Sequence, residues 1–263
     1  MIDDARWVQR LLPAYRYGVI LPGLGGVQRG VDYQFYRLAP LSVMQIGTGI
    51  GIRDYSAASV DAAMARFWDC VEQLRRQEVD CIVLSGVPVS TRLGRARVLA
   101  LAEEVHRRTR LPFFSTMEAV VSALAALGAK SVAVASRFPE EVNASLAEYL
   151  EQAGLAVAAI TSRDVSLGEA QTLTLAQGMR LTLEVGREAS RAAAGADALL
   201  IPGGAVPSLH AIPALEEEYH RPALTNLSAE VWAALIRPGI APPVQGWGRL
   251  LAAAGNTRDI SSG

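Results

Sequence analysis

The chain has little cysteine and histidine and no long uninterrupted apolar run. Its 263 residues include two cysteines, Cys70 and Cys81, and three histidines. The cysteines match no zinc or CxxC spacing, and scattered histidines argue against a histidine-rich metal site. No segment approaches about 18 consecutive apolar residues, as a transmembrane helix would, and the first residues lack the apolar core of a signal peptide. We therefore expect a cytoplasmic protein without a metal site.

Charge of either sign is also scarce. Lysine and arginine number 25 against 26 acidic residues, which gives a net charge of −1. This balance gives no electrostatic reason to expect a nucleic acid or a membrane surface as partner. Hydrophobic residues make up 51% of the chain, which is typical of globular proteins. The length is sufficient for one large α/β domain or two smaller ones.

Two distant segments share one plan. Asp80–Ser90 and Asp197–Ser208, about 117 residues apart, each consist of a short apolar run followed by a turn of small residues and proline. Each predicts a buried strand that ends in a loop, the usual ligand position in an open α/β sheet. Neither loop carries an obvious nucleophile or acid.

The rest of the chain alternates strand and helix patterns, which favours parallel sheets. Predicted strands are Tyr17–Leu21, Leu41–Ile46, Cys81–Leu84, Lys130–Ala135 and Asp197–Ile201, and predicted helices are Ser56–Gln77, Arg95–Arg108 and Met117–Leu127. Arg221–Trp232 also resembles Leu111–Val121. We predict an α/β fold of two pseudo-symmetric Rossmann-like lobes, residues 1–129 and 130–235, with a cleft between them. Residues 236–263 are expected to pack back on the first lobe.

Three features of the sequence bear on nucleophilic catalysis or nucleotide binding. The glycine-rich turn 23–26 has the wrong spacing for a dinucleotide fingerprint, and residues 27–32 do not resemble a helix start, so a tight turn lining the cleft is favoured. Ser85 and Ser208 lie near strand ends, but neither is in a G-x-S-x-G elbow and no histidine partner is evident. A serine hydrolase is therefore the least favoured enzyme.

Acids and arginines near the predicted cleft offer better chemistry. Glu118 opens a helix after a polar pair, where it either complements the helix dipole or acts as a general acid or base. Arg53, Arg92 and Arg137 follow strand or turn ends, and arginine binds carboxylates through two parallel hydrogen bonds. Arg137 is favoured because the segment Ser136–Val142 opens a helix whose N–H groups also attract anions.

The same segments resemble the aspartate/glutamate racemase superfamily, in its arylmalonate decarboxylase and maleate isomerase branch. The likeness spans Tyr17 to Leu250 and rests on Gly18–Gly26, Asp80–Ser90, Leu111–Gly128, Glu141–Asn143, Gly203–Gly204, Leu209–Pro213 and Thr225–Trp232. The resemblance implies two Rossmann-like lobes with the active site between them and neither metal nor organic cofactor.

The resemblance also implies catalytic cysteines that this chain lacks. Family members carry one or two at the strand ends, where Gly86 and Pro202 stand here. Val87 and Pro88 replace hydroxyl and N–H donors that stabilise an enediolate, and Phe138 replaces a tyrosine. Each lost donor of this kind costs about 3 kcal/mol of barrier stabilisation.

From these observations we predict an enzyme that acts on a small carboxylate ligand through an enolate-like intermediate without a catalytic cysteine. The alternative is a non-catalytic binding or regulatory protein on the same scaffold, and a homo-oligomer remains open. Glu118 is the predicted acid or base. The predicted substrate-binding residues are Arg53, Ser85, Gly86, Val87, Thr116, Arg137, Phe138, Asn143, Pro202, Gly203, Gly204 and Asn226.

Overall fold

Two four-stranded parallel sheets form the frame of the molecule. The computed structural model describes residues 12–23 and 29–253. The first sheet has the order β2 (Val43–Gly49), β1 (Tyr15–Leu21), β3 (Cys81–Leu84) and β4 (Phe113–Ser115). The second has the order β6 (Ala156–Ser162), β5 (Ser131–Ser136), β7 (Ala198–Ile201) and β8 (Ala223–Thr225). The two sheets have the same strand order, so the predicted α/β fold of two similar lobes is confirmed.

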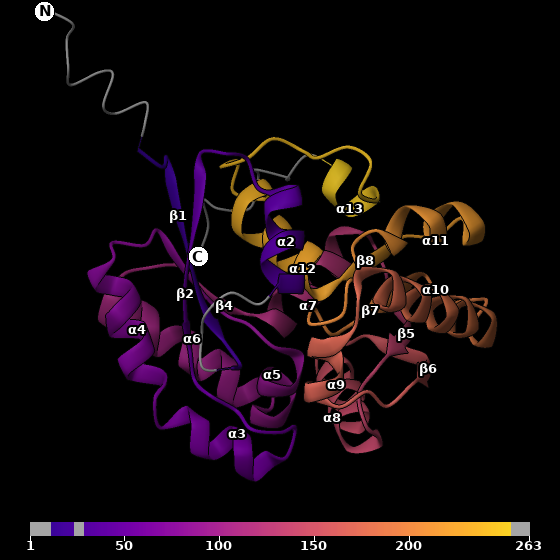
Figure 1. The fold of residues 1–263 in the computed structure, drawn as a ribbon, viewed down its shortest axis with the longest axis horizontal. Coiled ribbons are helices and arrows are strands. Elements are labelled where there is room, and N and C mark those ends of the chain that lie inside the picture. Colours follow the sequence, from indigo (N-terminus) through magenta and orange to yellow (C-terminus); the bar gives the residue numbers. More distant parts are fainter. Residues whose placement is uncertain (1–11, 24–28, 254–263) are drawn as a thin grey trace, which may run out of the picture.

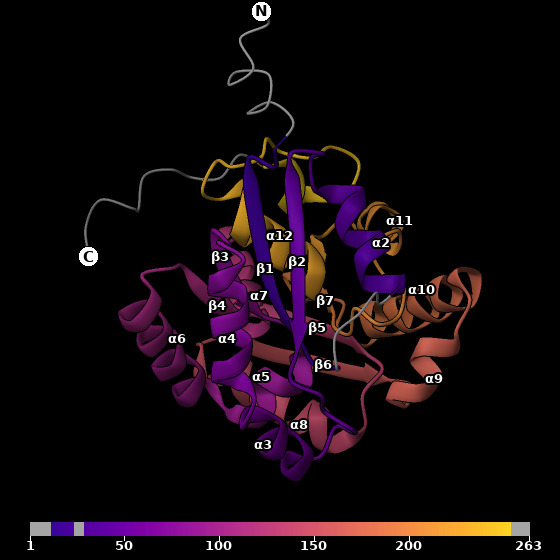
Figure 2. The ribbon, with the colours of Figure 1, turned by 60° about the vertical axis from the view of Figure 1, so that its left-hand side comes forward.

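The helices gather around each sheet and between them. The first half contains α2 (Arg29–Leu38), α3 (Ala57–Met64), α4 (Phe67–Arg76), α5 (Val87–Leu93), α6 (Arg95–Thr109) and α7 (Thr116–Ala126). The second contains α8 (Glu140–Gln152), α9 (Leu167–Thr172), α10 (Leu175–Ala192), α11 (Ala211–Tyr219), α12 (Asn226–Val231), the π-helix η1 (Trp232–Ile236) and α13 (Arg249–Ala252). Figures 1 and 2 show the two halves side by side, and α7 packs directly on α12 where they meet.

Two local predictions in the first half are wrong. Residues 29–38 form α2, although the segment 27–32 does not resemble a helix start. Helix formation here is favoured by burial of one face, since Gln34, Phe35 and Leu38 are buried at helical spacing. The helix predicted over Ser56–Gln77 is two helices, because the chain turns at residues 65 and 66 between α3 and α4.

The loop after β3 is also shorter than predicted. Only Ser85 and Gly86 separate β3 from α5, so most of the small-residue turn predicted there is helical. Pro88 lies in the first turn of α5, where a missing N–H leaves no helical hydrogen bond unmade. The strand end therefore leads almost directly into a buried helix. Of the turn 23–26, only Gly23 lies within the described residues.

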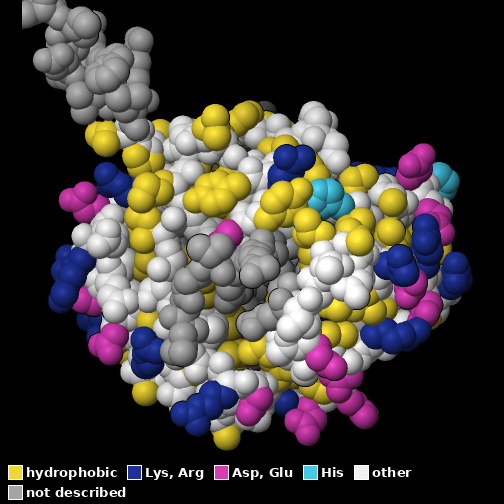
Figure 3. All heavy atoms as spheres, in the orientation of Figure 1, with side chains coloured by type: hydrophobic (Ala, Val, Ile, Leu, Met, Phe, Trp, Pro, Cys, Tyr) yellow, Lys and Arg dark blue, Asp and Glu magenta, His cyan; other side chains and the backbone are white. Residues whose placement is uncertain are grey.

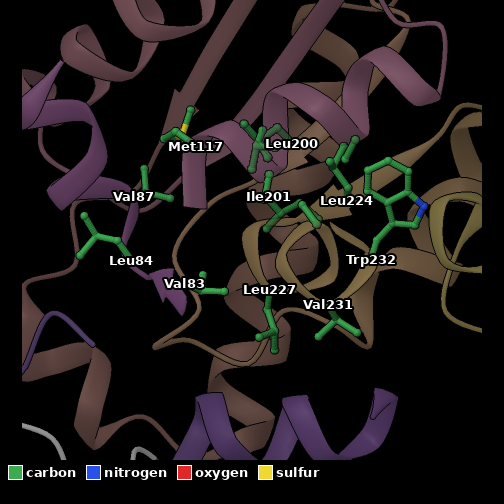
Figure 4. Close-up of a cluster of buried hydrophobic side chains, with 14 of the residues drawn as sticks. Val83, Leu84, Val87, Met117, Leu200, Ile201, Leu224, Leu227, Val231 and Trp232 are labelled. Atoms are coloured by element: carbon green, nitrogen blue, oxygen red, sulfur yellow. The ribbon is translucent and has the colours of Figure 1, made fainter. Parts of the chain in front are cut away.

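Buried side chains from both lobes form one continuous hydrophobic core. Figure 4 shows part of it, which includes Leu84 of β3, Met117 of α7, Leu200 of β7, and Leu227 and Val231 of α12. The two sheets therefore share apolar contacts through α12 and α7. The lobe boundaries at 129 and 235 stay a prediction, and residues 254–263 of the predicted last segment lie outside the described residues.

The surface is mixed in character. In the view of Figure 3, acidic and basic side chains alternate around the rim, and apolar side chains lie toward the middle of that face. None of the helices in the described ranges is long and apolar enough to cross a bilayer.

Candidate active site

A cavity lies between the lobes at the carboxyl ends of the central strands. This is the position that parallel sheets favour for ligands, because loops at that edge diverge. The lining residues come from both halves of the chain: Leu21, Pro22, Gly23, Val31, Ile52, Tyr55, Ser85, Gly86, Val87, Pro88, Arg137, Phe138, Leu167, Gly203, Gly204, Ala205, Asn226, Leu227 and Glu230. Eight of the predicted binding residues are among them: Ser85, Gly86, Val87, Arg137, Phe138, Gly203, Gly204 and Asn226.

Gly86 sets the backbone path at the end of β3. Its φ of +112° is in the region that only glycine adopts readily. A Cβ at this position would lie 2.5 Å from Cγ of Pro22. The Gly86 N–H donates to Oγ1 of Thr116 at 2.8 Å, which ties the end of β3 to the start of α7. A side chain at Gly86 would therefore displace the wall of the cavity.

Gly203 plays the matching part at the end of β7. A Cβ there would lie 2.5 Å from Nε of Arg137, so glycine permits the arginine to pass close to the backbone. The Gly203 N–H donates to Oδ1 of Asn226 at 2.9 Å and is therefore already used. The Gly204 N–H has no hydrogen-bond partner among the described residues. Pro202 lies off the main cavity and lines a smaller neighbouring one.

Arg137 is a buried cation in the wall of the cavity. Its side chain donates to the Tyr55 hydroxyl at 2.9 Å and to the carbonyl oxygens of Val165 and Gly203 at 3.3 and 3.4 Å. The guanidinium also lies 4.7 Å from the centre of the Phe138 ring. No described carboxylate forms an ion pair with it. A buried charge without a counter-ion is costly, and an anionic ligand would offset that cost.

Glu230 is the one acidic side chain in the described lining, and the sequence analysis did not single it out. It is 2% exposed. The Thr116 hydroxyl donates to Oε1 at 2.5 Å and the Ser85 hydroxyl at 3.2 Å. Burial raises its pKa to about 7, although hydrogen bonds from Thr116, Ser85 and Asn226 act in the opposite direction. The available sequence signal was a single charge inside the otherwise uncharged segment Thr225–Trp232.

Glu118 does not reach this cavity. Its carboxylate pairs with Nε of Arg95 at 2.9 Å and accepts from the Tyr149 hydroxyl at 2.9 Å. It lines a different cavity, together with Cys81 and residues of β4 and η1. Thr116, two residues earlier on α7, reaches Glu230, and residues two apart on a helix point in nearly opposite directions. The prediction of a cleft-facing acid on α7 therefore placed it on the wrong face.

Three other predicted binding residues also lie off the cavity. The exposed Arg53 uses its backbone N–H to bond Ser59 and does not line the cleft. Asn143 is buried and bridges the Ser136 hydroxyl and the Phe138 carbonyl, at 2.5 and 2.8 Å. Asn143 therefore holds the loop that presents Arg137. Thr116 acts through Glu230 and Gly86.

Serine and cysteine nucleophiles are not supported by the geometry. Ser85 bonds Glu230, and no histidine is in the described lining. Ser208 is buried beside the smaller cavity. Cys70 and Cys81, the only cysteines in the chain, are both buried outside the main cavity, and burial raises the pKa of the Cys81 thiol to about 11. A thiol with that pKa carries almost no thiolate at neutral pH.

Comparison with known proteins agrees with this architecture. The family model described as arylmalonate decarboxylase matches residues 31–251. Arylmalonate decarboxylase of Bordetella bronchiseptica is 28% identical over 235 residues, which cover 89% of this chain and 95% of that protein. A liganded double mutant of arylmalonate decarboxylase has a TM-score of 0.82 at 27% identity, covering 90% of this chain and 98% of that one.

The maleate isomerases share the fold. A mutant of the enzyme from Pseudomonas putida S16, solved with maleate, has a TM-score of 0.78 at 20% identity and covers 92% of this chain and 98% of that one. The family match over most of the chain and the curated relative do not favour the alternative of a non-catalytic small-acid-binding or regulatory protein on the same scaffold. The chain belongs to the arylmalonate decarboxylase family, in the branch of the aspartate/glutamate racemase superfamily that includes the maleate isomerases.

Proposed function

We propose that this protein is a cofactor-independent enzyme that decarboxylates or isomerises a small carboxylic acid through an enolate-like intermediate, without a catalytic cysteine. The observation that carries the proposal is the buried Arg137 guanidinium in the wall of the interlobe cavity, which forms no ion pair with any described carboxylate. One relative is named arylmalonate decarboxylase. Because loss of carbon dioxide from an arylmalonate leaves an electron pair on the α-carbon, this relative supports a substrate with a carboxylate on such a carbon.

Arg137 is suited to hold the carboxylate that remains on the substrate. Contacts from Tyr55, Val165 and Gly203 fix the plane of the guanidinium, so little side-chain entropy is lost when a ligand binds. In a cavity that excludes water, a fixed cation also stabilises the negative charge that develops as an enolate forms. The Gly204 N–H, which has no partner among the described residues, supplies a second donor at the same edge.

The rest of the cavity favours an apolar substituent on the acid. Leu21, Ile52, Val87, Leu167 and Leu227 contribute apolar surface to its lining. Such a lining excludes water from the carboxylate that is lost and removes the solvation that keeps a dicarboxylate stable in water. The proposed substrate is therefore a small diacid, or a related monoacid, with one apolar group.

The test is turnover of a defined panel by the purified protein. Aryl- and alkylmalonates, maleate and 2-arylpropionates are incubated with wild type, and products are followed by proton NMR with carbon dioxide capture. Arg137→Gln should lose at least about 100-fold in kcat/KM, which is typical for loss of a charge-stabilising donor. The matched control is Arg97→Gln, because Arg97 is an exposed arginine paired with Asp61 far from the cavity.

Two results would contradict the proposal. If the acids raise the melting temperature but are recovered unchanged, the protein is a binder and not an enzyme. If Arg53→Gln removes activity and Arg137→Gln does not, the carboxylate contact belongs to Arg53 instead.

A further inference from the structure

Glu230 occupies a position where a proton donor for the cavity would be needed. It is the only acid in the described lining, and neither cysteine of the chain reaches that cavity. We propose that the Glu230 carboxyl is the catalytic group that transfers the proton to and from the substrate α-carbon. This assignment rests on the proposed function and names the group that takes the place of a thiol.

The carboxyl is held in place from several elements at once. Thr116 on α7 and Ser85 after β3 donate hydrogen bonds to it, and the Asn226 amide, one turn earlier on α12, lowers its pKa. Asn226 in turn accepts the Gly203 N–H. A proton donor must be aimed within hydrogen-bond reach of the reacting atom. These contacts fix Glu230 relative to both strand ends.

The charged surroundings leave Glu230 free to change its protonation state. No described cation pairs with it. On the helices packed against α12, Glu118 is paired with Arg95 and Asp32 bonds Gln45 at 2.5 Å.

Two further groups share the neighbourhood of Glu230. One is the buried hydroxyl of Tyr17 on β1, whose pKa is raised by burial and by the nearby Glu230. This hydroxyl has no hydrogen-bond partner of good geometry in the described structure. The other is Arg137, the cation in the described cavity lining, which directly follows β5, whereas Glu230 is on α12. A bound carboxylate on Arg137 would therefore place the substrate between a fixed cation and a neutral acid.

Burial tunes Glu230 for this task. With its pKa raised to about 7, both protonation states are populated at neutral pH, which is the condition under which acid–base catalysis is most efficient. The π-helix η1 begins two residues later, and its Arg237 N–H bonds the Trp232 carbonyl at 2.8 Å. Single π-turns occur frequently at functional sites.

The proposed step conserves atoms and electrons. In a malonate-type diacid held by Arg137, the bond from the α-carbon to the other carboxylate breaks and carbon dioxide leaves. The electron pair stays on the α-carbon as the enolate of the remaining carboxylate. Glu230 gives its proton to that carbon and becomes a carboxylate, which regains a proton from solvent after product leaves. The reverse transfer exchanges the α-proton of a monoacid.

The test uses the intact protein and a prochiral 2-aryl-2-methylmalonate. Wild type should give one product enantiomer, and deuterium at the α-carbon in D2O, because one fixed group delivers the proton from one face. Glu230→Gln keeps the shape of the side chain and removes the acid. It should lose at least about 100-fold in rate, or retain decarboxylation with a racemic product. Glu118→Gln changes a partly buried acid outside the cavity and should alter neither the rate nor the enantiomer.

A second variant separates proton transfer from a structural role. The Ser85 hydrogen bond lowers the pKa of Glu230, so Ser85→Ala should raise that pKa. The rate of proton donation falls as Glu230 ionises, so wild-type activity should decline above about pH 7. In Ser85→Ala this decline should move to higher pH, which a structural role of Glu230 would not produce.

The failures of the two proposals differ. If wild type turns over the malonate and Glu230→Gln gives the same rate and the same enantiomer, Glu230 is not the proton donor although the proposed function stands. The assignment is also overturned if Glu118→Gln loses activity while Glu230→Gln keeps it. Wild type that neither decarboxylates the malonate nor exchanges the α-proton of the monoacid overturns both proposals.

Discussion

Glu118 and Glu230 are buried to different degrees and have opposite surroundings. The Glu118 side chain is 18% exposed and is neutralised by Arg95, so its charge is compensated within the fold. Glu230 is almost fully buried, accepts hydrogen bonds from two hydroxyls, and has no described cationic partner. Hydrogen bonds alone do not offset the loss of water around a buried carboxylate. At the scale of single residues, the partner of each acid therefore decides its role.

The raised pKa of Glu230 predicts a pH-dependent stability. Its pKa is about 7 in the folded protein against an ordinary value of 4.5. Below pH 4.5 the carboxyl holds its proton in both the folded and the unfolded chain. Glu230 then makes its full contribution to the free energy of unfolding. As the pH rises to 7 the unfolded chain ionises first, so folding free energy on the order of 3 kcal/mol is lost. Above pH 7 the loss is constant.

Urea unfolding of wild type and Glu230→Gln from pH 4 to 8 measures this effect. The stability of wild type relative to the variant should fall with pH and then level off. A difference that does not change with pH would show that Glu230 titrates normally. Glu104→Gln is a useful control, because Glu104 belongs to a surface pair with Arg107 whose contribution is small.

At the scale of elements, α2 fastens the second lobe to the first. Gln34 is fully buried, and its Oε1 accepts the N–H groups of Ser208 and Leu209, both at 2.8 Å. Its Nε2 donates to the Gly204 carbonyl at 3.3 Å. One amide on α2 therefore fixes the loop after β7, the same loop that contributes Gly203 and Gly204 to the cavity.

Gln34→Leu should loosen that loop. The change leaves two buried N–H groups without an acceptor, at about 1–3 kcal/mol each, so a destabilisation of about 2–6 kcal/mol is expected. Amide exchange at Ser208 and Leu209 should accelerate, and ligand binding should weaken. The exposed Gln152→Leu on α8 is the matched control and should stay within about 0.5 kcal/mol of wild type. Unchanged exchange at Ser208 would contradict this role for Gln34.

At the scale of the whole molecule, the two lobes are similar in strand order but not separate in packing. Buried residues of β3, α7, β7, β8 and α12 belong to one core (Figure 4). The hydrogen bond between Ser85 and Glu230 joins residues 145 positions apart. Splitting the lobes would expose this apolar surface at about 25 cal/mol per Å².

We therefore expect the chain to unfold in a single transition. Calorimetry should give one peak whose calorimetric and van't Hoff enthalpies agree, and fluorescence and circular dichroism should report the same midpoint. Two resolved transitions would show that the lobes are independent domains. A carboxylate ligand should raise the single midpoint, since it binds only the assembled cavity.

Much of the frame could be predicted from the sequence. The apolar runs at Cys81–Leu84 and Asp197–Ile201 predict buried strands, and their common plan predicts a duplicated parallel architecture. Gly86, Arg137 and Gly203 could be placed at one cavity because parallel strand ends meet at one edge. These are consequences of local pattern and topology.

Only the tertiary structure decided which acid faces the cavity. Both Glu118 and Glu230 lie in helices, and the sequence contains no direct sign of the rotation of α7 or α12 about its axis. That rotation depends on packing between segments more than 100 residues apart, as the contact of Thr116 with Glu230 shows. Burial, and hence the raised pKa of Glu230 without a counter-ion among the described residues, follows from that packing and not from the residue itself.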